Sequence, residues 1–101
     1  GNIEKLMTQF LSMGDRVKDA PPKLQQAYAD AVAAINGHLN NADLDRASQK
    51  AQGLNEFMAW ALANQDLARL QERTAAHPLV QLARDAVNRI KQLIWGRKEA
   101  P

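Results

Sequence analysis

The residue types that most often carry chemistry are sparse in this chain and widely separated. His38 and His77 are the only histidines, and the sequence contains no cysteine. Neither His-Glu-x-x-His nor His-x3-His spacing occurs, and a zinc site needs three or four such ligands. The sequence therefore predicts neither a metal site nor a disulfide. We expect His38 to be a cation near the carbonyls of a helix end, and His77 to be simply the residue before a proline.

The hydroxyl side chains lack a neighbour that would activate one of them as a nucleophile. Thr8 and Ser12 share a helical face without a base, and Ser48 has no histidine within helical reach. Asp43 and Asp45 are two residues apart, so they would point to different sides of a helix. There is no Gly-x-Ser-x-Gly elbow and no glycine-rich phosphate loop. We therefore predict that the chain is not an enzyme and has no catalytic residue and no cofactor.

Basic residues gather in the last quarter of the chain and form one candidate binding surface. The net charge is −1 over residues 1–77 and +3 over residues 78–101. Arg84 and Lys91 are seven residues apart and so share a helical face, with an amide between them. Cations and an amide on one face can contact phosphates and a base edge. The candidate nucleic-acid-binding residues are Arg84, Asn88, Arg89, Lys91, Arg97 and Lys98. The alternative interpretation is a solvated outer face near a helix C-terminus.

Trp95 followed by Arg97 and Lys98 could also place the end of this helix at a membrane interface. The apolar side of the same helix is needed for the core, so we expect no membrane partner. No run approaches 18 apolar residues, and no signal peptide is recognisable. The expected location is the cytoplasm.

Three of the five aromatic residues form a second candidate surface. Tyr28, Phe57 and Trp60 could line a groove for a partner helix, because aromatic residues are enriched at interface hot spots. The alternative is that these rings fill the core.

Composition and periodicity predict an all-α fold. Alanine (18) and leucine (12) dominate, whereas Val, Ile and Thr total 10, which favours helix over strand. Apolar residues recur three and four apart over segments separated by Pro21-Pro22, Asn40-Asn41 and His77-Pro78. We predict helices over 3–18, over 22–39, from Asn41 or Asp43 to a soft break at 64–66, and over 78–95, with a short helix over 65–76 between the last two. Gly96 should close the last helix. A break near Asn64 would add a fifth helix, and a single bent helix over 43–75 is the alternative.

These helices should pack as a compact antiparallel bundle in a single domain, residues 1–101, with 97–101 as a frayed tail. In the third segment the predicted inner stripe is Leu44, Ala47, Ala51, Leu54, Met58 and Ala61. The predicted core comprises Leu6, Phe10, Leu24, Ile35, Leu54, Met58, Leu62, Leu82, Ile90 and Leu93.

The segment from His77-Pro78-Leu79 to Ile94-Trp95-Gly96 resembles helices in accessory modules of large bacterial mobile-element and secreted proteins. The resemblance covers about 20 residues and implies a module of a larger bacterial protein. The chain begins without an initiator methionine, which indicates either a domain excised from a longer protein or a small protein without its methionine.

The predicted function is therefore a non-catalytic accessory module of a bacterial protein, which docks a partner or positions a neighbouring domain. The first alternative is nucleic-acid binding through Arg84, Arg89 and Lys91. The second alternative is a homodimeric bundle.

Overall fold

The computed structural model describes residues 2–65 and 77–99, with the backbone alone for Asn2 and for residues 93–99. Every regular element in this part of the chain is helical, so the predicted all-α class is confirmed. The elements are α1 (Asn2–Leu11), the 3-10 helix η1 (Gly14–Asp19), α2 (Pro22–Leu39), α3 (Arg46–Asn64) and α5 (Pro78–Glu99).

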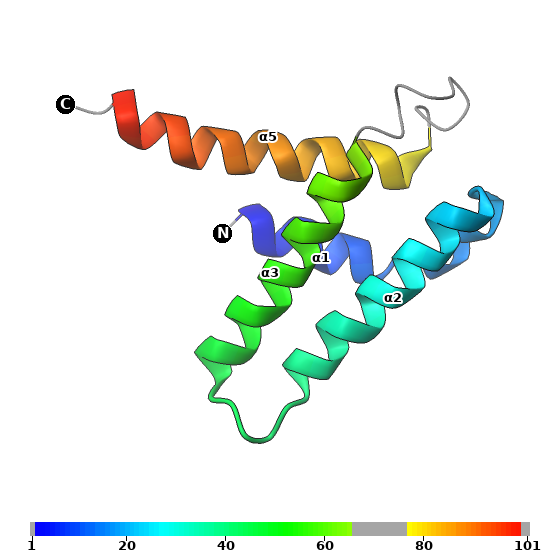
Figure 1. Cartoon of the computed structure of the whole chain (residues 1–101), viewed down its shortest axis with the longest axis horizontal. Helices are drawn as coiled ribbons and strands as arrows, with labels where there is room; N and C mark the ends of the chain where they lie inside the picture. The colour runs from blue at the N-terminus through cyan, green and yellow to red at the C-terminus, as the bar shows by residue number, and fades with distance from the viewer. Residues whose placement is uncertain (1, 66–76, 100–101) are drawn as a thin grey trace.

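The helices form a thin, two-layered bundle. Helices α2 and α3 make an antiparallel hairpin, and α1 and α5 run across its open end (Figure 1). The molecule measures 40 × 37 × 17 Å, and its shortest dimension fits two helix layers, whose axes pack 8–10 Å apart. The predicted antiparallel packing of sequence neighbours is confirmed for α2 and α3, and the C-terminal end of α5 extends beyond this hairpin.

The first predicted helix is broken, because α1 ends at Leu11 and η1 follows it. Ser12 donates its hydroxyl to the carbonyl oxygen of Gln9 at 2.8 Å, which competes with the helical ladder. Gly14 comes next and favours helix less than Ala by about 1 kcal/mol. The apolar spacing survives the break, since Phe10, Met13 and Val17 are all buried.

Helix α2 has the predicted bounds. Pro22 is its first residue, where the missing N–H costs no hydrogen bond. Its buried side chains are Leu24, Tyr28 and Ile35. The helix ends where Asn40 donates its backbone N–H to the carbonyl of Asn36 at 3.0 Å, in agreement with the predicted Asn-rich turn.

Helix α3 starts later than predicted and turns a different face to the core. Asp45 is its N-cap and accepts from the Ser48 backbone N–H at 2.7 Å, so the expected cap at Asn41 or Asp43 is wrong. Only this carboxylate reaches the third amide of the helix. The buried side is the one that carries the large rings, since aromatic burial outweighs burial of alanines. It comprises Gly53, Phe57, Trp60, Ala61 and Asn64.

The predicted stripe on α3 is consequently displaced. Ala47 and Ala51 are exposed, Leu54 and Met58 are half-buried, and Leu62, predicted for the core, is 49% exposed. Whether residues 43–76 form one helix or two lies outside the described residues, although α3 itself ends at Asn64, near the predicted break.

Helix α5 begins at Pro78, as predicted, and buries Leu82 of the predicted core. The same face of the helix also buries Leu79, Ala83, Ala86 and Val87. Ile90 and Leu6 are half-buried, and the side chain of Leu93 lies outside the described part. The helix passes through Gly96 to Glu99, so the predicted end at Trp95 is wrong. One glycine costs about 1 kcal/mol, and the Arg, Lys and Glu that follow it all favour helix.

Candidate nucleic-acid interface

The three aromatic candidates lie in the core, around the ring of Phe10. Its centroid is 4.7 Å from that of Tyr28, 5.2 Å from Phe57 and 4.4 Å from Trp60. The exposed fractions of these candidates are 7%, 0% and 5%, respectively. They therefore do not line an exposed groove in this chain. The rings supply the large apolar area that an alanine-rich hairpin lacks.

Three polar groups lie in the core with these rings. Tyr28 donates its hydroxyl to the carbonyl of Phe10 at 2.7 Å. Burial raises the pKa of the Tyr28 hydroxyl, and a backbone hydrogen bond with Met13 opposes part of that rise. The Trp60 indole nitrogen is buried with no acceptor among the described residues. Asn64 donates to the carbonyl of Trp60 at 2.8 Å, which satisfies its own buried amide.

The basic candidates of α5 lie on its outer side. Arg84, Asn88, Arg89 and Lys91 are all exposed, and the buried side of the helix lies opposite. Arg84 and Lys91 are two turns apart, about 10.5 Å along the axis, with Asn88 between them. These three residues form one row along the helix. Arg97 and Lys98 belong to the same helix, but their side chains lie outside the described part.

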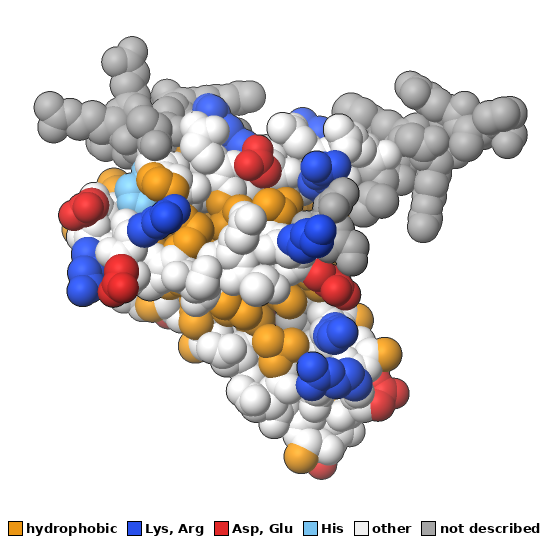
Figure 2. Space-filling view, turned by 180° about the vertical axis from the view of Figure 1, so that it is seen from behind, with side chains coloured by type: hydrophobic (Ala, Val, Ile, Leu, Met, Phe, Trp, Pro, Cys, Tyr) orange, Lys and Arg blue, Asp and Glu red, His pale blue; other side chains and the backbone are white. Residues whose placement is uncertain are grey.

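Arg89 stands apart from this row. It lies one turn beyond Asp85 on the same side of α5, where a carboxylate at i and a cation at i+4 are neighbours. Within the described residues, no ion pair ties the cations of the row to a carboxylate. Figure 2 shows that both cationic and acidic side chains surround a band of apolar ones on one face of the molecule. Any attraction to phosphate therefore depends on local rows of cations rather than on the overall charge.

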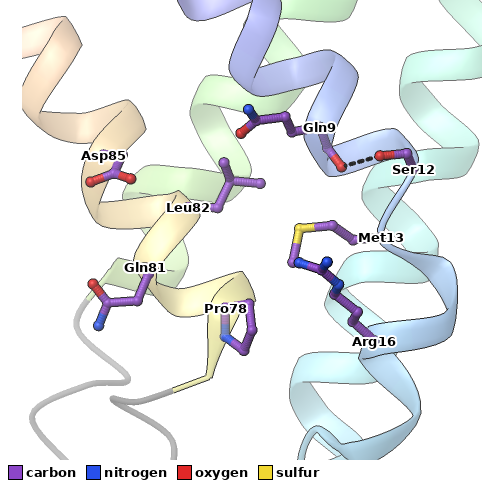
Figure 3. A pocket seen from close by; sticks show the side chains of 8 residues that line it. All are labelled: Gln9, Ser12, Met13, Arg16, Pro78, Gln81, Leu82 and Asp85. Atoms are coloured by element: carbon purple, nitrogen blue, oxygen red, sulfur yellow. Dashed lines mark hydrogen bonds between the residues drawn. The ribbon is translucent and has the colours of Figure 1, made fainter.

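A pocket of about 660 Å³ opens beside the first turns of α5 (Figure 3). Arg16 of η1 lies on one wall, and Gln81 and Asp85 of α5 lie on the other, with Met13 and Leu82 between them. The sequence alone did not predict this pocket, because its walls come from segments more than 60 residues apart.

Both histidines have partners that the sequence did not reveal. His38 Nε2 lies 3.1 Å from Glu56 Oε1 and links α2 to α3. His77 Nε2 lies 3.1 Å from the carbonyl oxygen of Arg16, and its Nδ1 accepts from the Leu79 backbone N–H at 3.1 Å. The prediction that His77 only precedes a proline is therefore wrong.

Two further features are absent from the part of the chain that the structure describes. No group of three His, Cys, Asp or Glu side chains is close enough to hold a metal ion in residues 2–65 and 77–99. No helix in the same ranges is long and apolar enough to cross a membrane.

One comparison with known proteins gives a relative across nearly the full length of the chain. The chain is 55% identical over 100 residues to the virion DNA-directed RNA polymerase of Enterobacteria phage N4. The match covers 99% of this chain and 3% of the N4 polymerase, so the matching segment is a small part of a much longer polypeptide. No family model matches the chain. No solved structure matches it either.

The similarity to the N4 polymerase overturns three predictions. The relative belongs to a phage, so the prediction of a module from a bacterial protein is wrong. It is named as a polymerase, which is an enzyme, so the predictions of a non-catalytic accessory function and of no enzyme are contradicted as well. The physical reason for the failure is that one short helical segment of a long enzyme need not carry the residue patterns of that enzyme's chemistry.

Proposed function

We propose that this chain is a helical segment of a virion DNA-directed RNA polymerase, and that it binds nucleic acid through the row Arg84, Asn88 and Lys91 on α5. The observation that carries the first part is the 55% identity with the N4 polymerase over 100 residues. At this identity the two segments are expected to share their fold and the surroundings of their core.

The second part rests on the geometry of α5. Two cations and an amide lie in one exposed row, and no carboxylate among the described residues pairs with those cations. Lysine and arginine side chains supply the phosphate contacts of nucleic-acid-binding proteins, and amides reach base edges. The sequence repeats the seven-residue spacing once more at Lys98, which would lengthen the row. A protein named as DNA-directed must hold a DNA template, and this row is the surface of the chain best suited to contact one.

A salt titration of DNA binding tests the row. Fluorescence polarisation of a labelled DNA would be measured with the purified chain at several salt concentrations. The double variant Arg84→Gln, Lys91→Gln should bind more weakly than the parent. The slope of log affinity against log salt should fall by about 1 for each phosphate that the variant no longer binds.

The matched control is Lys18→Gln, Lys23→Gln, which removes the same charge from exposed positions on η1 and α2. This control should bind as the parent does. If both variants bind DNA equally weakly, net charge alone explains the binding and the row has no special role. If the parent shows no salt-sensitive binding, the proposed interface is wrong.

A further inference from the structure

The pocket between η1 and α5 has an apolar floor and two walls that are fastened to each other. His77 Nε2 lies 3.1 Å from the Arg16 carbonyl oxygen, and this contact ties the start of α5 to η1. Met13 and Leu82 are only 7% and 6% exposed and form the floor. The volume of about 660 Å³ lies in the range of about 300–1,000 Å³ that is typical of small-ligand pockets. The pocket is therefore preformed and large enough for a planar ring.

The polar side chains around this floor carry opposite charges on the two walls. Arg16 and the amide of Gln9 belong to one wall, and Asp85 belongs to the other. Met13 and Arg16 extend from their wall toward α5 (Figure 3). In the part of the chain that the structure describes, the side chains of Gln9, Arg16 and Asp85 make no hydrogen bond or ion pair with the protein. A ligand would therefore meet an unpaired cation on one side and an unpaired carboxylate on the other.

Gln81 connects the pocket to the row Arg84, Asn88 and Lys91. It lines the pocket and lies three residues before Arg84, so the spacing of three and four residues that makes the row continues into the pocket. The step from Gln81 to Arg84 is about 4.5 Å along the helix axis. A nucleic-acid strand that lies along the row would thus reach the pocket without leaving α5.

We propose that the pocket receives one unpaired base of this nucleic acid, and that Asp85 selects a base with an exocyclic amino group. The inference rests on the proposed function, since the row on α5 must bind nucleic acid. A carboxylate only accepts hydrogen bonds. It accepts one from the amino group of cytosine, whereas the O4 of thymine is itself an acceptor and is repelled.

The charged walls fix the orientation of the nucleotide in the pocket. A phosphate beside Asp85 would bring two anions together, whereas a phosphate beside Arg16 accepts charge-assisted hydrogen bonds from the guanidinium group. The base consequently lies toward Asp85 and the phosphate toward Arg16. The floor suits a base in this position, because the thioether of Met13 makes favourable contacts with aromatic rings.

The preference between two pyrimidines tests the role of Asp85. Fluorescence polarisation would compare labelled oligodeoxycytidine and oligothymidine of equal length, whose bases have the same ring size. The parent should bind the cytosine strand about 3- to 10-fold more tightly. An asparagine amide both donates and accepts, so in Asp85→Asn the ratio of the two affinities should fall to about 1. Equal affinities in the parent, or an unchanged ratio in Asp85→Asn, would overturn the base pocket.

Matched variants separate the pocket from net charge and from the row. Asp15→Asn removes the same charge from an exposed position of η1 outside the pocket, and it should keep the ratio of the parent. Arg16→Gln should weaken the binding of both strands by a similar factor, because a phosphate contact does not read the base. Lys18→Gln is its control, and equal binding by these two variants would contradict the phosphate contact. A parent that binds neither strand would overturn the interface on α5 as well, whereas a parent that binds both equally would overturn the pocket alone.

Discussion

Tyr28 and Phe10 are joined twice, by a 2.7 Å hydrogen bond from the tyrosine hydroxyl to the Phe10 carbonyl and by rings 4.7 Å apart. This pair connects α2 to α1 at the point where α1 is about to end. Because Phe57 and Trp60 of α3 pack on the same Phe10 ring, one aromatic side chain holds three helices together.

Tyr28→Phe should lower the free energy of unfolding by about 1–3 kcal/mol. The ring contacts remain, but the buried Phe10 carbonyl loses the tyrosine hydroxyl that donates to it. Chemical denaturation monitored by circular dichroism would measure the change. A variant as stable as the parent would mean that this hydrogen bond does not stabilise the fold.

The raised pKa of Tyr28 predicts that the folded protein loses stability in alkali. Burial raises the pKa of Tyr28, so the folded state prefers the neutral hydroxyl. The resulting stability is fully present below the ordinary tyrosine value of 10.0 and declines as the pH rises through the raised value. Melting temperatures measured through this range should fall more in the parent than in Tyr28→Phe. Parallel curves for the two proteins would contradict the assignment.

Asp45→Ala should lower the melting temperature at neutral pH, because the Ser48 N–H at the start of α3 loses its acceptor. Hydrogen bonds with the backbone and then the side chain of Ser48 hold the pKa of the Asp45 carboxyl below its ordinary 3.8. This contribution is present above that ordinary value and is lost as the pH falls through the lowered one. Asp45→Asn, which still caps, should retain most of the neutral-pH stability and lose this acid dependence.

Substitution by a larger residue should change the stability of the chain differently at two glycines of the hairpin, Gly37 and Gly53. A Cβ at Gly37 would meet nothing within 4 Å, so Gly37→Ala should stabilise the chain by about 1 kcal/mol through helix propensity. A Cβ at Gly53 would lie 3.4 Å from Leu39 Cδ2 and 3.6 Å from Ile35 Cγ2. Gly53→Ala should therefore be tolerated, whereas Gly53→Leu should force α2 and α3 apart. Denaturation midpoints of the three variants give the comparison, and a Gly53→Leu variant as stable as the parent would contradict the close approach.

Much of the fold followed from local sequence signals. Pro22, Asn40 and Pro78 marked helix boundaries, because proline and asparagine act on the backbone next to them. The inner face of α5 was predictable since its apolar residues occupy one side of the helix. In α3 the alanine–leucine stripe and the Phe57–Trp60 side were both apolar, and only packing against Phe10 decided between them.

Parts of the candidate site could also be predicted from the sequence, and other parts could not. The exposed row on α5 could be predicted, because alternation of apolar and charged residues identifies the outer side of a helix. The pocket and the His77 link could not, since each joins residues more than 60 positions apart. No spacing rule within one helix reports such a contact.

The most direct test of the proposed function is DNA-dependent RNA synthesis by the full-length polypeptide that contains this chain, measured against template concentration. We predict RNA synthesis by the parent. We also predict that Arg84→Gln, Lys91→Gln raises the half-saturating template concentration several-fold at unchanged maximal rate, while Lys18→Gln, Lys23→Gln matches the parent. A parent without DNA-dependent synthesis would contradict the polymerase assignment. Identical template curves for all three proteins would contradict the role of α5.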